Sequence, residues 1–129
     1  MDRFINIYIN IFKSFSDGTR LRIIRLLLEA KRELCICEIM DSLKLAQYNI
    51  SKHIKELKIA GLVQERREGR FIFYSLISQK DKFHKQLMQT ISSIPEESFL
   101  KDFECLKKRL SLRKCGKVVM GMNKIREIK

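Results

Sequence analysis

The chain has 129 residues, enough for one compact domain with a hydrophobic core and hardly enough for two. Apolar residues make up 45% of it, which argues against wholesale disorder, and five Gly with one Pro leave little material for a loop-rich β architecture. Lys and Arg number 27 against 15 Asp and Glu, and the net charge of +12 is typical of a protein that binds a polyanion, with nucleic acid favoured over an anionic membrane surface.

The first predicted element is a helix over about residues 3–15, where Phe4, Tyr8 and Phe12 recur at helical spacing. Isoleucines widen this apolar stripe, so the helix needs more than one packing partner. A dimer interface supplies the second partner, and a central helix of a monomer is the alternative. The apolar run "FINIYINIF" is far shorter than the ~20 residues of a membrane span, and no secretory cleavage site follows it. We therefore expect no membrane association and a cytoplasmic location, where thiols stay reduced.

Three further helices are predicted next. Asp17 is a good N-cap for the helix over "GTRLRIIRLLLEA". A short helix over "CEIMDSL" follows and ends near Lys44, and another runs from near Ala46 to about Ile59, with Gly61 expected just beyond its end. A helix, a tight connection and a second helix form a helix-turn-helix.

The pattern then changes period. Two runs rich in β-branched and aromatic residues within 62–76, joined at Glu68-Gly69, predict a β-hairpin. Helical spacing returns over 83–94 until Pro95 breaks it, and a last helix is predicted over about 97–110.

We divide the chain accordingly into a domain over 1–110, for DNA binding and dimerisation, and a basic C-terminal tail over 111–129 with weak periodicity. The predicted fold class is mainly α with a β-hairpin, in the arrangement of a winged helix-turn-helix.

The helix over 46–59 is predicted to read DNA, because Ile50, Ile54 and Leu57 point inward and polar residues point outward. Its lysines are expected on phosphates and residues 47–49 on base edges. His53 lies nearer the buried face, so packing or a phosphate contact is favoured there over base reading. A solvated face is the alternative for the hairpin arginines taken alone. The predicted DNA-binding residues are Gln47, Tyr48, Asn49, Ser51, Lys52, His53, Lys55, Arg66, Arg67 and Arg70.

Cys35 and Cys37 lie one residue apart in "ELCICEIM". A disulfide across one residue is strained and out of place in a reducing compartment, and a thioredoxin-like site would need Cys-X-X-Cys. Core packing suits at most one of the two, because positions i and i+2 of a helix point apart. A frayed helix start would let both thiolates converge on one soft, thiophilic ion.

The stretches "FKSFSDGTRLRIIRLLLEA", "ELCICEIMDSL" and "AQYNISKHIKELKIAGLVQERREGRFIFYSL" resemble successive signatures of the ArsR/SmtB metalloregulatory repressors over about residues 10–77. The resemblance implies a homodimer that binds an inverted-repeat DNA operator and leaves it when a metal or metalloid binds. Two departures stand out. Gly18 replaces a usual Pro, and Ala46-Gln47-Tyr48 replaces Ser-Gln-Pro at the start of the recognition helix.

The same resemblance implies that the stretch from Glu33 to Glu38 binds the inducer, as in members that sense arsenite, antimonite, cadmium or lead. A third Cys of one arsenic-sensing pattern is replaced here by Met40. The third thiolate must then come from Cys115, slightly favoured, or Cys105. As(III) or Sb(III) is the expected inducer, because the additional N-terminal cysteines of cadmium and lead sensors are missing from this sequence. No organic cofactor is expected.

The rival interpretations are a cadmium- or lead-sensing repressor, a repressor that senses thiol oxidation through the same cysteines, and a nucleoid-type DNA-binding protein whose cysteines are structural. Oxidation sensing is disfavoured because Glu33 and Glu38 raise the pKa of the neighbouring thiols. A zinc site at Asp81 and His84 is also disfavoured, with Asp81 expected as a helix cap and His84 on the surface. No catalytic pairing of a nucleophile and a base is found, so the chain is not expected to be an enzyme.

Overall fold

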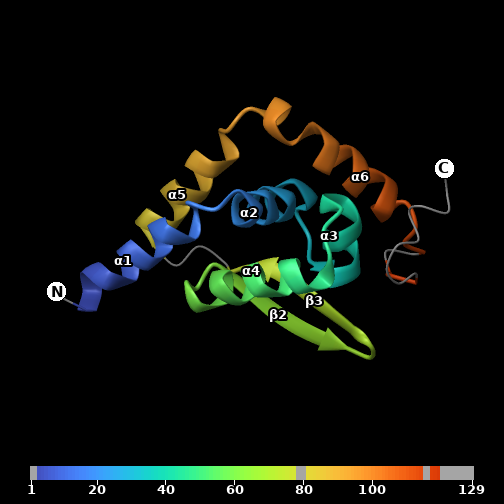
Figure 1. The fold of residues 1–129 in the computed structure, drawn as a ribbon, viewed down its shortest axis with the longest axis horizontal. Coiled ribbons are helices and arrows are strands. Elements are labelled where there is room, and N and C mark those ends of the chain that lie inside the picture. The colour runs from blue at the N-terminus through green and yellow to red at the C-terminus, as the bar shows by residue number, and fades with distance from the viewer. Residues whose placement is uncertain (1–2, 78–80, 115–116, 120–129) are drawn as a thin grey trace.

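The computed structural model describes residues 3–77, 81–114 and 117–119. It is mainly helical with a small antiparallel sheet, which confirms the predicted fold class (Figure 1). Among the described residues no helix is both long and apolar enough to cross a bilayer. In chain order the elements are α1 (Arg3–Ser14), α2 (Gly18–Ala30), β1 (Leu34–Cys35), α3 (Ile36–Leu43), α4 (Gln47–Ile59), β2 (Val63–Glu68), β3 (Phe71–Leu76), α5 (Lys82–Ser92), the 3₁₀ helix η1 (Glu96–Phe99) and α6 (Leu100–Leu110).

The helix boundaries follow local chemistry. The Asp17 carboxylate accepts a hydrogen bond from the Arg20 N–H at 3.0 Å and so caps α2 as predicted. Lys31 and Lys44 end α2 and α3 in the left-handed conformation, and Gly61 follows α4 with a φ of 76°. Ala46 precedes α4 without a side-chain cap, in keeping with its poor capping ability.

The apolar faces of α2, α3 and α4 form one core. Ile24, Leu26, Ile39, Ile50 and Leu57 are fully buried in it. Burying a side chain of this size stabilises a fold by about 1.5–3 kcal/mol, so these faces hold the helix-turn-helix in place. The polar face of α4 is left outward.

Two ion pairs fasten α6 to this core. The Arg22 guanidinium donates to both Asp102 carboxylate oxygens, at 2.9 and 2.8 Å, and also to the Leu43 carbonyl at 2.9 Å. Asp41 of α3 and Arg109 of α6 form a second pair at 2.9 Å, with side chains 3% and 1% exposed. The C-terminal helix is therefore anchored beside the segment that carries the cysteines.

The sheet has the strand order β1-β3-β2. The predicted hairpin is confirmed, with Gly69 at its tip in the left-handed region at a φ of 60°. The short strand β1 was not predicted. It places Leu34 opposite Tyr74 and Cys35 opposite Phe73, and thereby joins the start of α3 to the hairpin.

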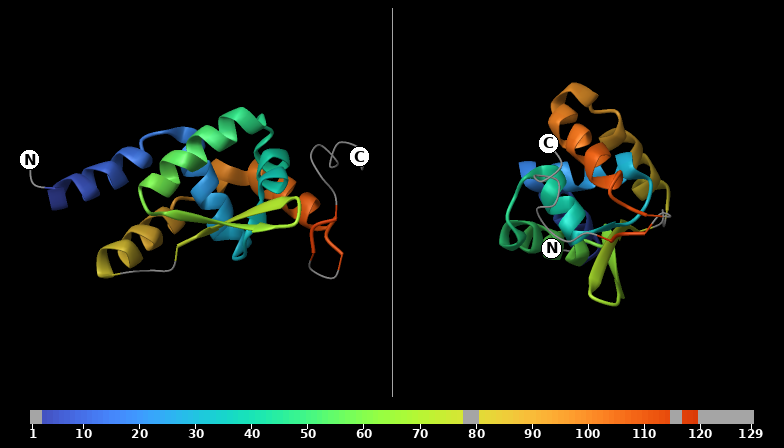
Figure 2. Two further views of the ribbon diagram at one scale, coloured as in Figure 1. Left: turned by 90° about the horizontal axis from the view of Figure 1, so that it is seen from below. Right: turned by 90° about the vertical axis from the view of Figure 1, so that its right-hand side faces the viewer.

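At the other end of the molecule α1 extends away from the core (Figure 2) and contacts α5 through aromatic rings. The Tyr8 and Phe12 rings each form a T-shaped pair with the Phe83 ring, with centroids 5.0 and 5.9 Å apart. Asp81 caps α5 as expected, because its carboxylate accepts from the His84 N–H at 2.9 Å. The expectation of a surface His84 is wrong: the residue is 7% exposed, since it lies on the buried side of α5 together with Met88.

Candidate nucleic-acid interface and thiol site

The polar face of α4 forms a continuous exposed surface. Ile50, Ile54 and Leu57 are at most 2% exposed behind it, and Tyr48 in front is 76% exposed. All the predicted contact residues on this helix except His53 are exposed: Gln47, Tyr48, Asn49, Ser51, Lys52 and Lys55. Amide, hydroxyl and ammonium groups thus stand together on one face, with the donors and acceptors that base edges and phosphates require.

His53 lies at the contact between α4 and the start of α2. Its Nδ1 is 3.4 Å from Arg20 Nη1 and 3.6 Å from an Asp17 carboxylate oxygen, and its side chain is 12% exposed. The pKa of Asp17 is lowered, chiefly by the hydrogen bond from the Arg20 N–H and further by His53 and the Arg20 charge. In this arrangement His53 packs between helices, and it does not share the open face of Lys52 and Lys55.

The hairpin arginines Arg66, Arg67 and Arg70 are all exposed, but their surroundings differ. Arg66 forms ion pairs with Glu33 and with Glu68. The Arg70 guanidinium lies 5.3 Å from the centroid of the Phe71 ring, at the tip of the hairpin. Arg66 therefore has carboxylate partners within the protein, which neither sequence position nor charge had indicated.

Cys35 and Cys37 lie at the junction of β1 and α3. Cys35 occupies the N-cap position with extended backbone angles, and the structure joins the two sulfurs in a disulfide. The sulfurs meet because Cys35 is outside the helix, so the divergence of helical positions i and i+2 does not apply. Convergence at the helix start is thus as expected, whereas the bond differs from the free thiols that the sequence analysis favoured. Both residues are buried, at 0% and 5% exposed.

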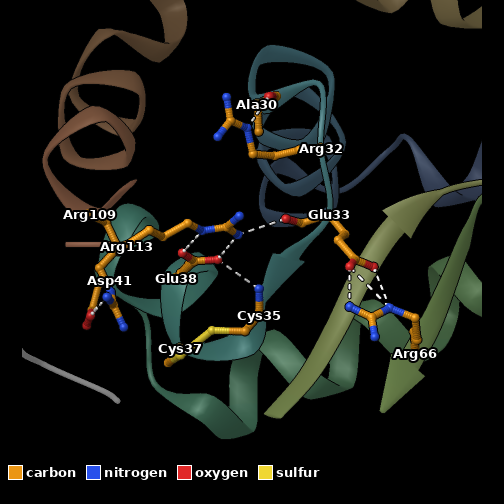
Figure 3. A network of polar contacts seen from close by, with 10 residues as sticks. All are labelled: Ala30, Arg32, Glu33, Cys35, Cys37, Glu38, Asp41, Arg66, Arg109 and Arg113. Atoms are coloured by element: carbon orange, nitrogen blue, oxygen red, sulfur yellow. Dashed lines mark hydrogen bonds and ion pairs between the residues drawn. A yellow bond between two sulfur atoms is a disulfide. The ribbon is translucent and has the colours of Figure 1, made fainter. Parts of the chain in front are cut away.

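A buried carboxylate supports this junction (Figure 3). Glu38, which is fully buried, accepts from the Cys35 N–H at 3.0 Å and from two Arg113 nitrogens at 2.7 and 2.6 Å. Arg113 also donates to the Glu33 carbonyl at 2.9 Å. Arg113 was not singled out from the sequence, because the basic tail contains many Lys and Arg residues that look equivalent there. The spacing Cys35-X-X-Glu38 does match a capping box, and that signal could have indicated the role of Glu38.

The carboxylates on either side of the cysteines are therefore both paired with arginines. Glu33 pairs with Arg66, and the pKa of Glu33 is lowered, mainly by hydrogen bonds from that guanidinium. Glu38 pairs with Arg113. The expectation that two bare acidic charges disfavour the thiolates does not describe this site, since each charge has an adjacent cation.

The structure does not bring a third cysteine sulfur to Cys35 and Cys37 within the described residues. Cys105 is a free, half-buried cysteine on α6, and Cys115 lies outside the described residues. Met40, on α3, is buried in the hydrophobic core. Within the described ranges no three residues of the His, Cys, Asp and Glu types are grouped so as to hold a metal ion.

A cavity of about 440 Å³ connects the thiol site with both predicted DNA-contacting elements. Cys35 and Cys37 line one side of it, Gln47 comes from the first turn of α4, and Arg70 comes from the hairpin tip. Ile36, Phe71 and Ile72 complete the lining. A ligand at the cysteines would thus sit beside the two elements that face DNA.

Comparisons with known proteins agree with this arrangement. Residues 17–65 match the family model described as "Bacterial regulatory protein, arsR family". The chain is 46% identical over 72 residues to an uncharacterized HTH-type transcriptional regulator of Methanocaldococcus jannaschii, covering 56% of this chain and 80% of that protein. It is 36% identical over 80 residues to the arsenic resistance transcriptional regulator ArsR2 of Pseudomonas putida, covering 62% and 69%.

A relative named for a different metal is also found. The cadmium resistance transcriptional regulatory protein CadC homolog of Staphylococcus aureus is 34% identical over 79 residues, covering 61% of this chain and 62% of that protein. Among solved structures, reduced HlyU from Vibrio cholerae matches with a TM-score of 0.58 at 27% identity, covering 69% of this chain and 88% of that chain.

Proposed function

The chain belongs to the ArsR/SmtB family of transcriptional repressors, and on that premise we propose that it is a homodimer that binds an inverted-repeat operator and releases it when As(III) or Sb(III) binds to cysteine thiolates. DNA binding and the lack of an enzymatic role follow from the family, whose members here are transcriptional regulators. The inducer, the contact residues, the dimer and the cytoplasmic location are our proposal.

The proposed DNA interface consists of the open face of α4 and the hairpin as a wing. An exposed polar face backed by fully buried Ile50 and Leu57 supports it, because such a helix can enter the major groove without disturbing the core. The lysines and the hairpin arginines would neutralise phosphates and make binding depend on salt. The proposed contacts are Gln47, Tyr48, Asn49, Ser51, Lys52, Lys55, Arg66, Arg67 and Arg70, with His53 at the margin.

The proposed inducer site consists of the Cys35 and Cys37 sulfurs and a third from Cys115 or Cys105. The observation that carries this proposal is the convergence of two sulfurs at a helix start, beside a cavity shared with Gln47 and Arg70. Both cysteines must be reduced before they can bind, since a disulfide sulfur has no thiolate to offer. Two cellular thiol groups would supply the two electrons: the first forms a mixed disulfide with one cysteine and frees the other, and the second displaces that cysteine as a thiolate and leaves with the first thiol as their disulfide.

Release of DNA would follow from movement at the N-cap of α3. Cys35 is both a ligand and the cap residue, and Cys37 lies in the first turn. Drawing both sulfurs toward a third ligand would shift that turn and the adjoining start of α4. A coupling of about 1–3 kcal/mol between the two sites suffices for regulation.

The test is fluorescence anisotropy of the reduced protein on the DNA upstream of its own gene, titrated separately with arsenite, cadmium, zinc and peroxide. We expect arsenite to weaken binding by about 10-fold or more. Cys35→Ser and Cys37→Ser should abolish this response, and Cys105→Ser and Cys115→Ser should identify the third ligand. An arsenite-resistant complex that cadmium releases would assign the protein to the cadmium or lead class instead.

A second candidate function is sensing of oxidants, favoured by the disulfide between Cys35 and Cys37 and by the paired charges of Glu33 and Glu38. One thiolate would attack a peroxide oxygen to form a sulfenic acid and expel hydroxide or water. The second thiolate would then displace hydroxide, which leaves as water, and close the disulfide. Release by peroxide with no response to arsenite would establish this function and contradict the first.

A further inference from the structure

Arg66 is attached to the segment that carries the cysteines. Its Nε lies 3.1 Å from each carboxylate oxygen of Glu33, and its Nη2 also pairs with that carboxylate. Nη1 donates to Glu68 at 2.8 Å on the same strand. Glu33 immediately precedes β1, two residues before Cys35, so this contact ties the middle of β2 to the start of the thiol segment (Figure 3).

The same guanidinium also lies over an aromatic ring of the thiol site. Its central carbon is 4.8 Å from the centroid of Phe73, and the two residues are directly opposite in the β2–β3 register. Phe73 is 6% exposed and packs in one cluster with Cys35 and Cys37. Arg66 therefore meets the thiol segment twice, through the Glu33 carboxylate and through the Phe73 ring.

These contacts occupy the N–H groups of the Arg66 guanidinium that would otherwise donate to a phosphate. The Glu33 carboxylate accepts from Arg66 Nε and pairs with Nη2, so two nitrogens of the guanidinium are directed toward Glu33. Arg67 is the natural comparison. It carries the same charge on the same strand, but successive strand residues point to opposite faces, so its side chain is directed away from Glu33.

We propose that Arg66 is a positioning residue that couples the cysteine pair to the wing, by fixing the angle of the hairpin through Glu33 and Phe73. A change at Cys35 and Cys37 moves Phe73 and the strand that follows Glu33, and Arg66 transmits that movement to β2. Of the three hairpin arginines counted above as proposed DNA contacts, Arg67 and Arg70 keep that role. Arg66 instead governs how the inducer changes their contact with DNA. This assignment rests on the proposed repressor function.

The first experiment measures operator affinity by anisotropy, with and without arsenite, for the full chain and for Arg66→Gln, Glu33→Gln and Arg67→Gln. We expect the arsenite-dependent change in affinity to fall several-fold in Arg66→Gln and in Glu33→Gln. Arg67→Gln should instead weaken binding in both states and reduce the salt slope by about 1, with its arsenite response retained. The charge exchange Glu33→Arg with Arg66→Glu should recover part of the response.

A second measurement needs neither DNA nor arsenite. Amide hydrogen exchange over residues 63–76 is compared between the disulfide and the reduced dithiol. We expect reduction to change exchange in the hairpin of the wild type and to have little effect on it in Arg66→Gln. If the wild type fails to respond to arsenite but shows this difference, the inducer is wrong and the coupling stands. An Arg66→Gln protein with full arsenite response, normal hairpin exchange and a salt slope reduced by 1 would make Arg66 a phosphate contact and overturn the proposal.

Discussion

Cys35 has two roles in one residue, since it bears a sulfur and also occupies the N-cap of α3. Serine or threonine usually fills a cap position, where the side chain accepts from the first turn. Here the Glu38 carboxylate makes the reciprocal bond to the Cys35 N–H, and Arg113 neutralises the charge of that buried carboxylate. Any ligand that pulls on Cys35 therefore acts directly on a helix end and on a buried ion pair.

The Glu38–Arg113 pair is expected to contribute strongly to stability, because its side chains are 0% and 9% exposed. Arg113→Gln leaves a buried carboxylate without its cation, and we expect the free energy of unfolding to fall by about 3–5 kcal/mol. Urea denaturation monitored by circular dichroism measures this. Lys114→Gln, at an exposed neighbour, serves as the control and should change stability little.

The double variant Glu38→Gln with Arg113→Gln removes both charges and should recover part of the loss. Equal stability of Arg113→Gln and wild type would show that the C-terminal segment does not hold Glu38 in solution.

At the scale of one element, the start of α2 has a good N-cap, but its first helical residue is a glycine that could be replaced to raise stability. Asp17 caps it with extended backbone angles, φ −115° and ψ 132°. Gly18 stands at the first helical position, where proline is favoured because its fixed φ suits the helix and its missing N–H is not needed. Apart from its chain neighbours and the backbone of its own helix, no atom lies within 4 Å of the position that a Cβ at residue 18 would take, so the site has room for a side chain.

We therefore expect Gly18→Pro to stabilise the protein by about 0.4–1 kcal/mol, by restricting the unfolded chain. The extended conformation of Asp17 is the one that a residue before proline prefers, so no strain is added. Thermal unfolding measures the effect, with Gly18→Ala as a smaller change at the same position. A lowered melting temperature in Gly18→Pro alone would mean that the backbone N–H of residue 18 has a partner.

At the scale of the whole molecule, the outer surface of α1 is a broad exposed apolar surface in the part of the chain that the structure describes. Five large apolar side chains of that helix are between 42% and 64% exposed: Phe4, Ile5, Ile7, Tyr8 and Phe12. An exposed apolar patch of this kind marks an interaction surface. A second copy of the chain, related by two-fold symmetry, would cover it and place two copies of α4 in position for an inverted repeat.

The proposed homodimer can be tested through Phe4, which is 64% exposed. Phe4→Glu introduces a charge into the apolar face, so we expect a shift from dimer to monomer in sedimentation velocity and a loss of operator affinity. Tyr48→Glu is the control for the oligomeric state alone: Tyr48 is 76% exposed on α4, outside α1, so this variant should stay dimeric while its operator affinity falls, as expected of a DNA contact. Should Phe4→Glu remain dimeric, the dimer would have to form through another surface.

Much of the fold was predictable, because the strongest signals are local. Helical spacing, the Asp17 cap and the glycine at position 69 located the helices and the hairpin. The failures have a common cause in tertiary contacts. Strand β1 has two residues and exists only because β3 pairs with it. His84 is polar but is buried by the packing of its helix, which sequence spacing did not reveal.

By itself, the sequence determined a winged helix-turn-helix with a polar recognition face and a pair of cysteines just before it, since periodicity, caps and turn residues act within a few positions of the chain. Only the tertiary structure decided which charges meet. Glu33 pairs with Arg66 across 33 positions, and Arg113 reaches Glu38 across 75. Both pairs form because folding brings distant segments together. Burial adds a reason for Glu38 and Arg113, since an unpaired buried charge is costly, and no local sequence pattern carries that information.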